Sequence, residues 1–565
     1  MKELHELEAT ATGLGPTIFR PATPLKLSAW RKALANHPDQ QYSQYILQGI
    51  YQGFHIGANR TVTMQSSHSN MPSVQRQPQV VEAQIRAESE AGRLLGPLPP
   101  HLARIVHTSP IGLIPKPRQP GKWRLIVDLS SPTGASVNDA ISSEFCHMRY
   151  ASVLDAARLI RHLGKGTQLA KIDVHNAYRM VPVHPDDHHL LGIRWGQDVY
   201  IDTALPFGLR SAPKIFGAVS DALAWILHSK GVTFQLHYLD DFLLMGSPNT
   251  LYCAQALQCT LQACQELGVP IAAHKVEGPS CQLTFLGIKV DTLKMELSLP
   301  SEKLARITAM VFEWRNKKVA TKQQLQAIIG TLSHAAVVVI PGRTFLRRMI
   351  DTMKIPKQQH HHVRLNTEFQ SDVQWWACFL PRWNGRSILP PQQAAHSFWS
   401  DASGTWGCGA VSDTLHWFQV QWPESWQQYH IAAKEMIPVV IALALWGPAW
   451  RSSTVQAFSD NMAVVCALTA GSARDPLLMH LLRCSHFFCA HFKVAVQAQH
   501  IAGTHNSAAD ALSRNKHDIF LSYLPQAPRN PLQVPQPLLD MLLHNKPDWT
   551  SSNWRSLFLS TLQEL

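Results

Sequence analysis

The sequence predicts a multidomain protein of mixed α/β and α+β class. Its 565 residues exceed the length of a typical single domain, and 45% hydrophobic and 8% aromatic residues are typical of globular chains. Short apolar, strand-like runs alternate with helical patterns over residues 150–300 and again from about 396 to 515. A helical, basic stretch over residues 301–385 separates these two regions. The chain is therefore expected to form more than one core.

The remaining segments follow in chain order. Residues 1–58 have apolar residues at helical spacing, whereas residues 59–80 are polar and aperiodic, which predicts a linker. A helix is expected over about 81–95, ending at "GPLPP", before two strand-like runs. We therefore expect five parts: a helical N-terminal extension and linker (1–80), a first region of strands and helices (81–300), a helical connection (301–395), a second α/β region (396–515) and a proline-rich tail (516–565).

Composition restricts the class of protein. The net charge of +12 and the pI near 9.2 are compatible with polyanion binding. No apolar run approaches the 18 or more uncharged residues of a membrane span, and "MKELHELEATATGLG" lacks an apolar signal core. We therefore expect an intracellular protein, cytoplasmic or nuclear, that is neither secreted nor membrane-bound. Ten cysteines without a C-x-x-C pair argue against structural zinc and a disulfide framework.

Two adjacent acids interrupt an apolar run in "QLHYLDDFLLMG", residues 235–246. Burying an unpaired carboxylate is costly, so Asp240 and Asp241 require an explanation. Acids at a turn between strands can hold divalent cations, and a third carboxylate is available in Asp173, after the strand-like "QLAKI". Taken alone, Asp173 is equally well explained as a cap of the next segment.

An ordered series of motifs surrounds these acids. It comprises "LIPKPRQPGKWRLIVDLS", "LAKIDVHNAYRMVPVHP", "TALPFGLRSAPKIF", "YLDD", "LGVPIAAHKVEGP" and "LTFLGIKVD". The series resembles the reverse transcriptases of LTR-type retrotransposon Pol polyproteins. It is closest to DIRS-like elements, with gypsy-like elements next, and Phe207 stands where the retroviral pattern has glutamine. The resemblance implies a right-hand polymerase, with fingers and palm over 81–300 and thumb and connection over 301–395.

The resemblance also implies a two-metal site. Asp173, Asp240 and Asp241 would bind two Mg²⁺ ions, with Mn²⁺ as a substitute. Arg124, with Lys116 or Arg118, would clamp the nucleotide triphosphate, Tyr178 would crowd the sugar 2′ position, and Lys275 would protonate pyrophosphate. A solvated basic hairpin, simple packing and a surface lysine are the corresponding non-catalytic explanations. The implied nucleotide-binding set is Lys116, Arg118, Arg124, Tyr178, Phe207, Gly208 and Lys275.

A second acidic set lies in the last α/β region. Asp401 and Asp460 end strand-like runs, Glu435 begins an apolar helix with Pro438 in its first turn, and Asp510 lies on a short helix. Each acid alone is explained as a cap or a first-turn charge. In this order they resemble ribonuclease H over residues 396–515. The resemblance implies two-Mg²⁺ hydrolysis of RNA in an RNA–DNA hybrid, with His500 and His505 both near the last acid.

Other features bear on partners and on rival functions. No D-[ST]-G protease motif precedes the first region and no integrase pattern follows residue 515, while the flanks look similar to DIRS-like polyproteins. The implied partners are an RNA template, a DNA primer, their hybrid, dNTPs, an element-encoded Gag-like protein and a tyrosine recombinase. The main alternative is a catalytically inactive, host-adopted nucleic-acid-binding protein, and the intact acids of both sets argue against such decay. An RNA-dependent RNA polymerase is a third possibility, disfavoured by Tyr178 and by the second acidic set.

Overall fold

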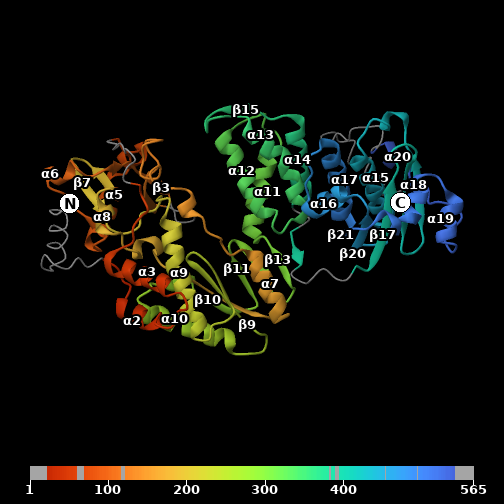
Figure 1. Ribbon diagram of the computed structural model, residues 1–565. Coiled ribbons are helices and arrows are strands. Elements are labelled where there is room, and N and C mark those ends of the chain that lie inside the picture. The colour runs from red at the N-terminus through yellow and green to blue at the C-terminus, as the bar shows by residue number, and fades with distance from the viewer. Residues whose placement is uncertain are drawn as a thin grey trace. The chain divides into compact units, whose positions relative to one another are not determined.

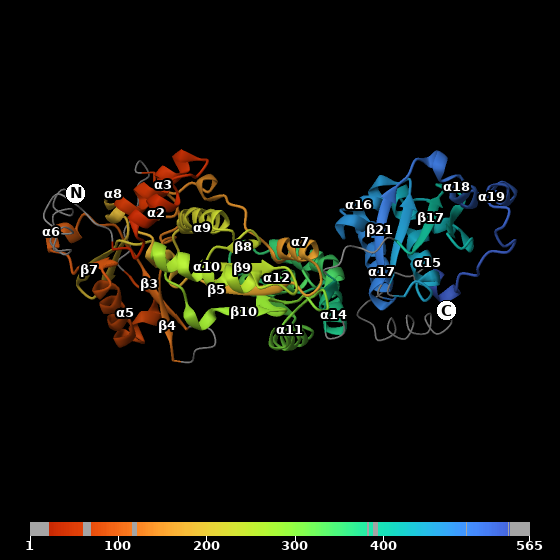
Figure 2. The same cartoon turned by 90° about the horizontal axis from the view of Figure 1, so that it is seen from below.

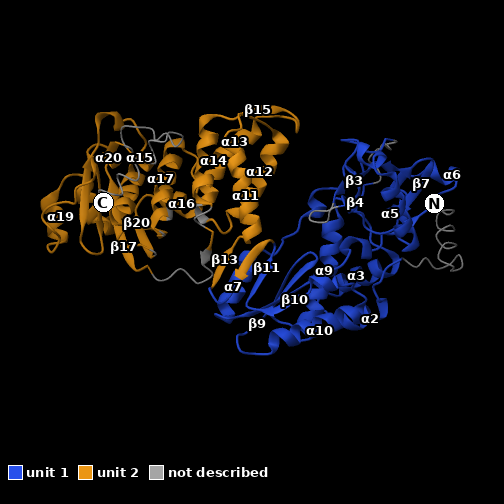
Figure 3. Cartoon of the chain, turned by 180° about the vertical axis from the view of Figure 1, so that it is seen from behind, with its two compact units in different colours: residues 1–286, 291–294 blue, residues 287–290, 295–565 orange. Residues whose placement is uncertain are grey.

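The computed structural model describes residues 22–59, 69–115, 121–380, 384–387, 394–451, 453–492, 494–540 and 542. The chain divides into two compact units, residues 1–286 with 291–294 and residues 287–290 with 295–565 (Figure 3). Within the described ranges, no helix has the length and apolar character needed to cross a membrane. Both units contain helices and sheets, which confirms the predicted mixed multidomain class. The five-part division stays a prediction.

The first described residues form two helices that pack into the core of the first unit. Helix α2 (Leu27–Ala33) and helix α3 (Gln40–Gln52) are separated by a short segment that contains His37 and Pro38. Asp39 caps α3 by accepting a hydrogen bond from Tyr42 N. Trp30 is fully buried and its Nε1 donates to Leu267 O over 3.0 Å. This segment is thus part of the first core.

The predicted linker is wrong over residues 69–80. Helices α4 (Pro72–Gln75) and α5 (Pro78–Glu90) occupy this stretch, and both have proline in the first turn, where its missing N–H is tolerated. Val74 is fully buried, and Asn70 Oδ1 accepts a hydrogen bond from Ile111 N. The polar composition concealed this packing. Helix α5 also begins and ends earlier than the 81–95 that we expected.

Two small sheets follow. Strands β3 (Ile111–Pro115) and β4 (Trp123–Val127) form an antiparallel hairpin whose inner residues pack with α5. A four-stranded sheet has the order β1-β7-β6-β2. Its strands are β1 (Leu94–Leu95), β7 (Asp198–Asp202), β6 (Gly192–Trp195) and β2 (Thr108–Ser109). These elements lie within residues 81–300, where the resemblance implies fingers and palm.

The first unit also contains a second four-stranded sheet, in the order β10-β5-β9-β8. Helices α9 (Ala212–Ser229) and α10 (Tyr252–Leu267) lie against it (Figures 1 and 2). Ala170 and Ile172 of β5 join the helix-covered core, so the alternating residues Lys171 and Asp173 point to the opposite face. The strands are β10 (Glu277–Ser280), β5 (Gln168–Asp173), β9 (Asp241–Gly246) and β8 (Gln235–Tyr238).

The second unit contains the predicted helical stretch. Its helices are α11 (Ser301–Trp314), α12 (Lys322–Ala335), α13 (Arg347–Lys354) and α14 (Thr367–Phe379). A short antiparallel pair, β14 (Val319–Thr321) and β15 (His362–Arg364), joins two of the connecting loops. Thr321 caps α12 in a capping box with Gln324, which explains why that helix starts there.

A five-stranded sheet in the order β19-β18-β17-β20-β21 organises the rest of the second unit. The first three strands are antiparallel, and β17, β20 and β21 are parallel. Helices α15 (Ile431–Trp446) and α17 (Pro476–Phe492) pack against each other, and α18 (Ser507–Ser513) contacts β17 and β18. The strands are β19 (Trp417–Gln421), β18 (Gly407–Ser412), β17 (His396–Ala402), β20 (Thr454–Ser459) and β21 (Ala495–His500).

The helix that carries Glu435 starts earlier than the sequence predicts. Helix α15 begins at Ile431 with His430 as its N-cap, so Pro438 lies inside the helix and the prediction of a first-turn position is wrong. The helix starts one turn earlier than the apolar pattern suggested.

Part of the proline-rich tail packs on this sheet. Phe520 of α19 (His517–Tyr523) is fully buried, and Trp417 Nε1 donates to Pro528 O over 2.7 Å.

Candidate active sites

The first acidic set converges at one end of the β10-β5-β9-β8 sheet. The antiparallel register of β5 and β9 places Asp173 directly opposite Asp241. Asp240 occupies the two-residue turn between β8 and β9, and its carbonyl accepts a hydrogen bond from Val174 N. Leu239, the other turn residue, has φ +54°, an uncommon conformation for a branched side chain. The fold therefore brings together the three acids that the sequence singled out.

Two lysines accompany these acids. Lys275, in the turn Ala273–Lys275, lies 2.7 Å from Asp173 Oδ2 through its Nζ. Lys171, two residues before Asp173 on the same strand face, lies 2.8 Å from Glu277 Oε1 and donates to Thr284 O. We singled out Lys275 from the sequence and missed Lys171. The alternating pattern of β5 was the signal that could have placed Lys171 on the acidic face.

Electrostatics at this site favour a bound cation. Burial, followed by the charges of Asp240 and Asp173, raises the pKa of Asp241 to about 6. Burial, then the charge of Asp173, also raises the pKa of Asp240. Hard divalent ions prefer such carboxylate oxygens, so the residues fit a divalent metal.

The predicted nucleotide-binding residues lie around an aromatic cluster. The Tyr178 ring packs edge-to-face on Phe207 and Phe216, with centroids 5.5 and 5.6 Å away. Burial, then the charge of Asp240, raises the pKa of Tyr178 to about 12. The Arg124 guanidinium lies 5.3 Å from the Phe207 ring centroid. Lys116 and Arg118 lie outside the described residues.

Gly208 fills a position that only glycine accepts. Its φ is +102°, and a Cβ there would lie 2.7 Å from Val127 O. Asn138, which sequence reasoning missed, holds this loop: its Nδ2 donates to Gly208 O over 2.9 Å, and its Oδ1 accepts from Arg210 N over 2.7 Å. The 207–210 loop is thus fixed against β4 and the segment around residue 138.

The second acidic set converges at the strand ends of the five-stranded sheet. Because β17 and β20 run parallel, Asp401 on β17 and Asp460 just after β20 lie at the same edge. Glu435 of α15 points to the same place. One carboxylate oxygen from each of these acids lies within 4.8 Å of the others. Asp510 of α18 belongs to the same electrostatic cluster and pairs with Arg514, whose Nε lies 2.7 Å from Asp510 Oδ1.

This cluster is strongly perturbed. Burial, then the charges of Asp401 and Asp460, raises the pKa of Glu435 to about 9. Burial raises the pKa of Asp401 to about 6, although a hydrogen bond from Ser513 opposes the shift. Glu435 Oε2 is buried without a hydrogen-bond partner. A buried, unpartnered carboxylate oxygen facing two further acids fits a divalent metal ligand.

The two histidines near Asp510 differ in their surroundings. His500 Nε2 lies 3.0 Å from the main-chain oxygen of Asp460, and His505 is exposed in the turn Gly503–His505. A Cβ at Gly503 would approach Asp460 Oδ2 to 3.3 Å, so this turn lies against the acidic cluster. Both histidines are therefore near the cluster, as the sequence predicts, and the choice between them stays open.

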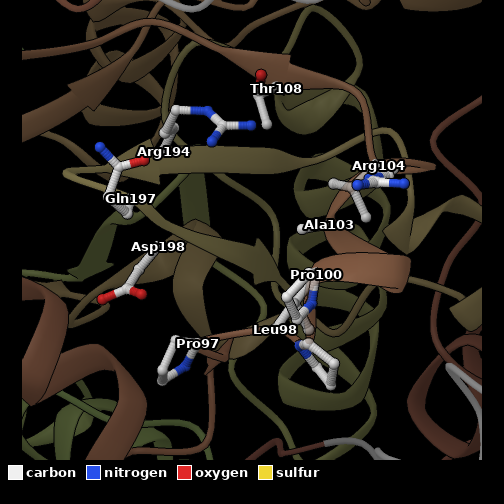
Figure 4. Close-up of a pocket in the computed structure, with 11 residues that line it drawn as sticks. Pro97, Leu98, Pro100, Ala103, Arg104, Thr108, Arg194, Gln197 and Asp198 are labelled. Atoms are coloured by element: carbon white, nitrogen blue, oxygen red, sulfur yellow. The ribbon is translucent and has the colours of Figure 1, made fainter.

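A separate pocket lies on the β1-β7-β6-β2 sheet (Figure 4). Arg104, Arg194 and Asp198 line it together with Pro97, Leu98 and Pro100. None of the predicted site residues is in its lining. The pocket is therefore distinct from both acidic sets.

Comparison with known proteins identifies one of the two regions. Residues 114–290 match the family model described as reverse transcriptase (RNA-dependent DNA polymerase). The chain is 25% identical to the Pro-Pol polyprotein of feline foamy virus over 290 residues, which is 50% of this chain and 22% of that protein. It is 22% identical to the transposon Tf2-3 polyprotein of Schizosaccharomyces pombe over 441 residues, which is 73% of this chain and 29% of that protein. The chain thus contains a reverse transcriptase domain and spans less than a third of these relatives.

Solved structures give weaker likenesses. A foamy viral protease-reverse transcriptase in complex with double-stranded DNA aligns with a TM-score of 0.49 and 14% identity, covering 84% of this chain and 82% of that chain. A foamy viral protease-reverse transcriptase in complex with an RNA/DNA hybrid aligns with a TM-score of 0.47 and 14% identity, covering 84% of this chain and 63% of that chain.

Proposed function

We propose that this protein is an RNA-directed DNA polymerase with ribonuclease H activity, which copies retrotransposon RNA into DNA and degrades the RNA of the hybrid. The observation that carries the proposal is the register of β5 and β9, which sets Asp173 opposite Asp241 with Asp240 in the adjoining turn. All three acids lie within the stretch that matches the reverse transcriptase family.

In the polymerase site, Asp173, Asp240 and Asp241 would hold two Mg²⁺ ions, or Mn²⁺ in their place. When bound, the ions supply the charge neutralisation that phosphoryl transfer requires. Tyr178, fixed between Phe207 and Phe216, excludes a 2′-hydroxyl from the nucleotide sugar. Arg124 orients the triphosphate.

Lys275 completes this chemistry at the leaving group. Its Nζ lies 2.7 Å from Asp173 Oδ2, within reach of the acids that would bind the metals. From there it protonates the departing pyrophosphate. Half of its side chain is exposed, so a substrate phosphate can reach it.

In the ribonuclease H site, Asp401, Glu435, Asp460 and Asp510 would hold the metal ions. Metal-activated water would be the nucleophile on the RNA strand. The short mutual distances of the first three acids and the unpartnered Glu435 Oε2 support this assignment. The five-stranded mixed sheet with β17 at its centre supports a ribonuclease H-like fold for this region.

We further propose that the chain comes from a DIRS-like element, with a gypsy-like element as the second candidate. Phe207 in "LPFGLRSAP" supports this subtype. Its partners would then be an RNA template, a DNA primer, dNTPs, a Gag-like protein and a tyrosine recombinase, all acting inside the cell. A recombinase reading frame beside the gene would support the assignment, and an integrase frame would contradict it.

Primer extension tests the polymerase. The intact chain should extend a DNA primer on an RNA template with dNTPs and Mg²⁺, and Asp240→Asn should abolish extension. The matched control, Asp198→Asn, changes an exposed acid of the fingers and should extend normally. An inactive intact chain would support the inactive host-adopted alternative, and extension by Asp240→Asn at the intact rate would contradict the proposed polymerase site.

Hybrid cleavage tests the second site. The intact chain should cut the RNA strand of a labelled RNA–DNA hybrid with Mg²⁺, and Asp460→Asn should not. Asp518→Asn, at an exposed acid of α19, is the control. Cleavage by Asp460→Asn at the intact rate would remove ribonuclease H from the proposal.

A further inference from the structure

A histidine–carboxylate cluster lies away from both acidic sets. Ring nitrogens of His55 and His184 and a carboxylate oxygen of Asp186 all lie within 4.8 Å of one another. His184 lies near the end of the motif "LAKIDVHNAYRMVPVHP", but the proposed polymerase chemistry gives none of these three residues a role. His55 follows helix α3, and the other two lie at the start of helix α8 (Pro185–His188).

The backbone places these side chains independently of any ligand. Phe54 and Val183 form a parallel bridge, Phe54 N donates to Pro182 O, and His184 N donates to Phe54 O, both over 2.9 Å. Gly53 permits this approach, because a Cβ there would lie 2.3 Å from Val183 O. The two segments are therefore held together before any metal arrives, which lowers the entropic cost of forming a site.

A buried carboxylate orients one of the candidate ligands. His55 Nδ1 donates to Asp187 Oδ2 over 3.1 Å, and the same oxygen accepts from Ile56 N over 3.0 Å. The Asp187 side chain is only 4% exposed. A proton fixed on Nδ1 leaves the lone pair on Nε2, which is how outer carboxylates prepare metal-binding histidines.

The second histidine lies beside the third ligand. The His55 and His184 rings stack with centroids 4.0 Å apart. His184 Nδ1 lies 3.7 Å from Asp186 Oδ2, and neighbouring ligand atoms of a tetrahedral zinc ion lie roughly 3.3 Å apart. His184 Nδ1 also accepts a hydrogen bond from Asp186 N over 3.2 Å, and a metal between these side chains would replace that bond.

We infer that His55, His184 and Asp186 form a zinc site that fastens the N-terminal helices to the polymerase domain. Two imidazoles and one carboxylate favour Zn²⁺ over Mg²⁺, which prefers oxygen ligands. The cysteine pattern that argues against structural zinc does not bear on a histidine–carboxylate site. The site is separate from the proposed Mg²⁺ centres and stands whether or not the chain polymerises DNA.

Zinc titration of the full chain tests the inference. After chelator treatment, the protein is titrated with Zn²⁺ against a chromophoric competitor in the presence of excess Mg²⁺. The intact chain and the control His228→Ala, an exposed histidine of α9, should each bind one more equivalent than His55→Ala or His184→Ala. The extra ion should bind with a dissociation constant of about 1 µM or tighter and raise the melting temperature.

A second variant separates ligand loss from misfolding. Asp187→Asn keeps all three ligands and removes the carboxylate behind His55, so zinc affinity should fall roughly 10- to 100-fold. Equal zinc stoichiometry and affinity in the intact chain and His55→Ala would overturn the inference. Binding only at hundreds of micromolar Zn²⁺ would overturn it too, because surface histidines bind that weakly without a built site.

Discussion

Both acidic sets bring several carboxylates close together, but they differ in the positive charges that lie beside them. The first set has its own cations: Lys275 pairs with Asp173, and Lys171 and Lys275 both lower the pKa of Asp241. In the second set, the cation that acts on Asp401 is Arg514, and that side chain is engaged by Asp510. Burial is the largest cause of the shifts in both sets, and the pKa rises to about 6 at Asp241 and at Asp401 but to about 9 at Glu435.

This difference predicts different responses to metal. Without metal, Asp241, whose pKa is about 6, is largely ionised near neutral pH. Glu435 instead keeps its proton, so a metal must displace a proton to bind there. In return, Asp401, Glu435 and Asp460 already lie within 4.8 Å of one another and need little rearrangement. Lysine side chains thus offset part of the negative charge of the first set, whereas three acids of the second set already lie close enough together to share a metal ion.

The largest expected effect is that of Glu435→Gln. Hybrid cleavage should fall roughly 10³-fold, because metal binding contributes several kcal/mol to such a reaction. The metal-free chain should be as stable as the intact one, since Glu435 is already neutral at pH 7. Cleavage rates and thermal melting in chelator check both halves. Normal cleavage by the variant would contradict the role of Glu435 in metal binding, and a melting temperature well below that of the intact chain would contradict its neutral state.

Lys275→Gln tests the charge balance of the first set. Primer extension should fall roughly 10²-fold, the usual contribution of a general acid, while hybrid cleavage should not change. Lys165→Gln, at an exposed lysine, is the matched control. Single-turnover extension measures the effect. Equal rates for both variants would show that Lys275 is a surface charge without a role in catalysis.

Tyr178 provides a smaller, selective effect. Tyr178→Val should raise incorporation of ribonucleotides relative to deoxynucleotides roughly 10- to 100-fold, because space opens beside the sugar. Tyr178→Phe keeps the ring on Phe207 and Phe216 and should leave selectivity unchanged. Competition between rNTP and dNTP in primer extension gives the ratio. If Val and Phe behave alike, the ring does not set sugar selectivity.

The smallest expected effect is a pH dependence of stability. Below pH 4.5 Glu435 is protonated in both the folded and unfolded chain, so it has no effect on stability there. As the pH rises toward 9, the unfolded chain releases this proton and the folded chain keeps it, so the metal-free protein loses stability. Mg²⁺ should therefore raise the melting temperature more at pH 8.5 than at pH 7, where Asp241 and Asp401, whose pKa values are about 6, are already largely ionised. Glu435→Gln should remove that difference, and an unchanged difference would contradict the pKa assignment.

The sequence was sufficient for the framework of both sites. Asp173 ends β5, and Asp401 and Asp460 lie within one residue of the ends of β17 and β20, so the position of each acid at a sheet edge could be expected. The hydrophobic pattern did not predict the two helices that involve residues 69–80, because Val74 is the one buried side chain in this polar stretch. It also misplaced the start of α15, because His430 caps the helix before the apolar pattern begins.

Other features depend on contacts between distant residues. Asn138 fixes the loop at Gly208 across seventy positions of sequence, and His55 meets His184 only through a backbone bridge. Periodicity cannot reveal such pairs, because each partner looks like an ordinary polar residue in its own segment. The side chains that orient a site are therefore harder to predict from sequence than the acids that carry its charge.

The central claim is that one chain holds two independent metal-dependent sites, and a crossed assay tests it most directly. Primer extension and hybrid cleavage are measured on the same preparations of the intact chain, Asp240→Asn and Asp460→Asn, with Mg²⁺ and with chelator. We predict that Asp240→Asn loses extension and keeps cleavage, that Asp460→Asn does the reverse, and that chelator removes both activities. Loss of both activities in either single variant, or activity that survives the chelator, would contradict the account.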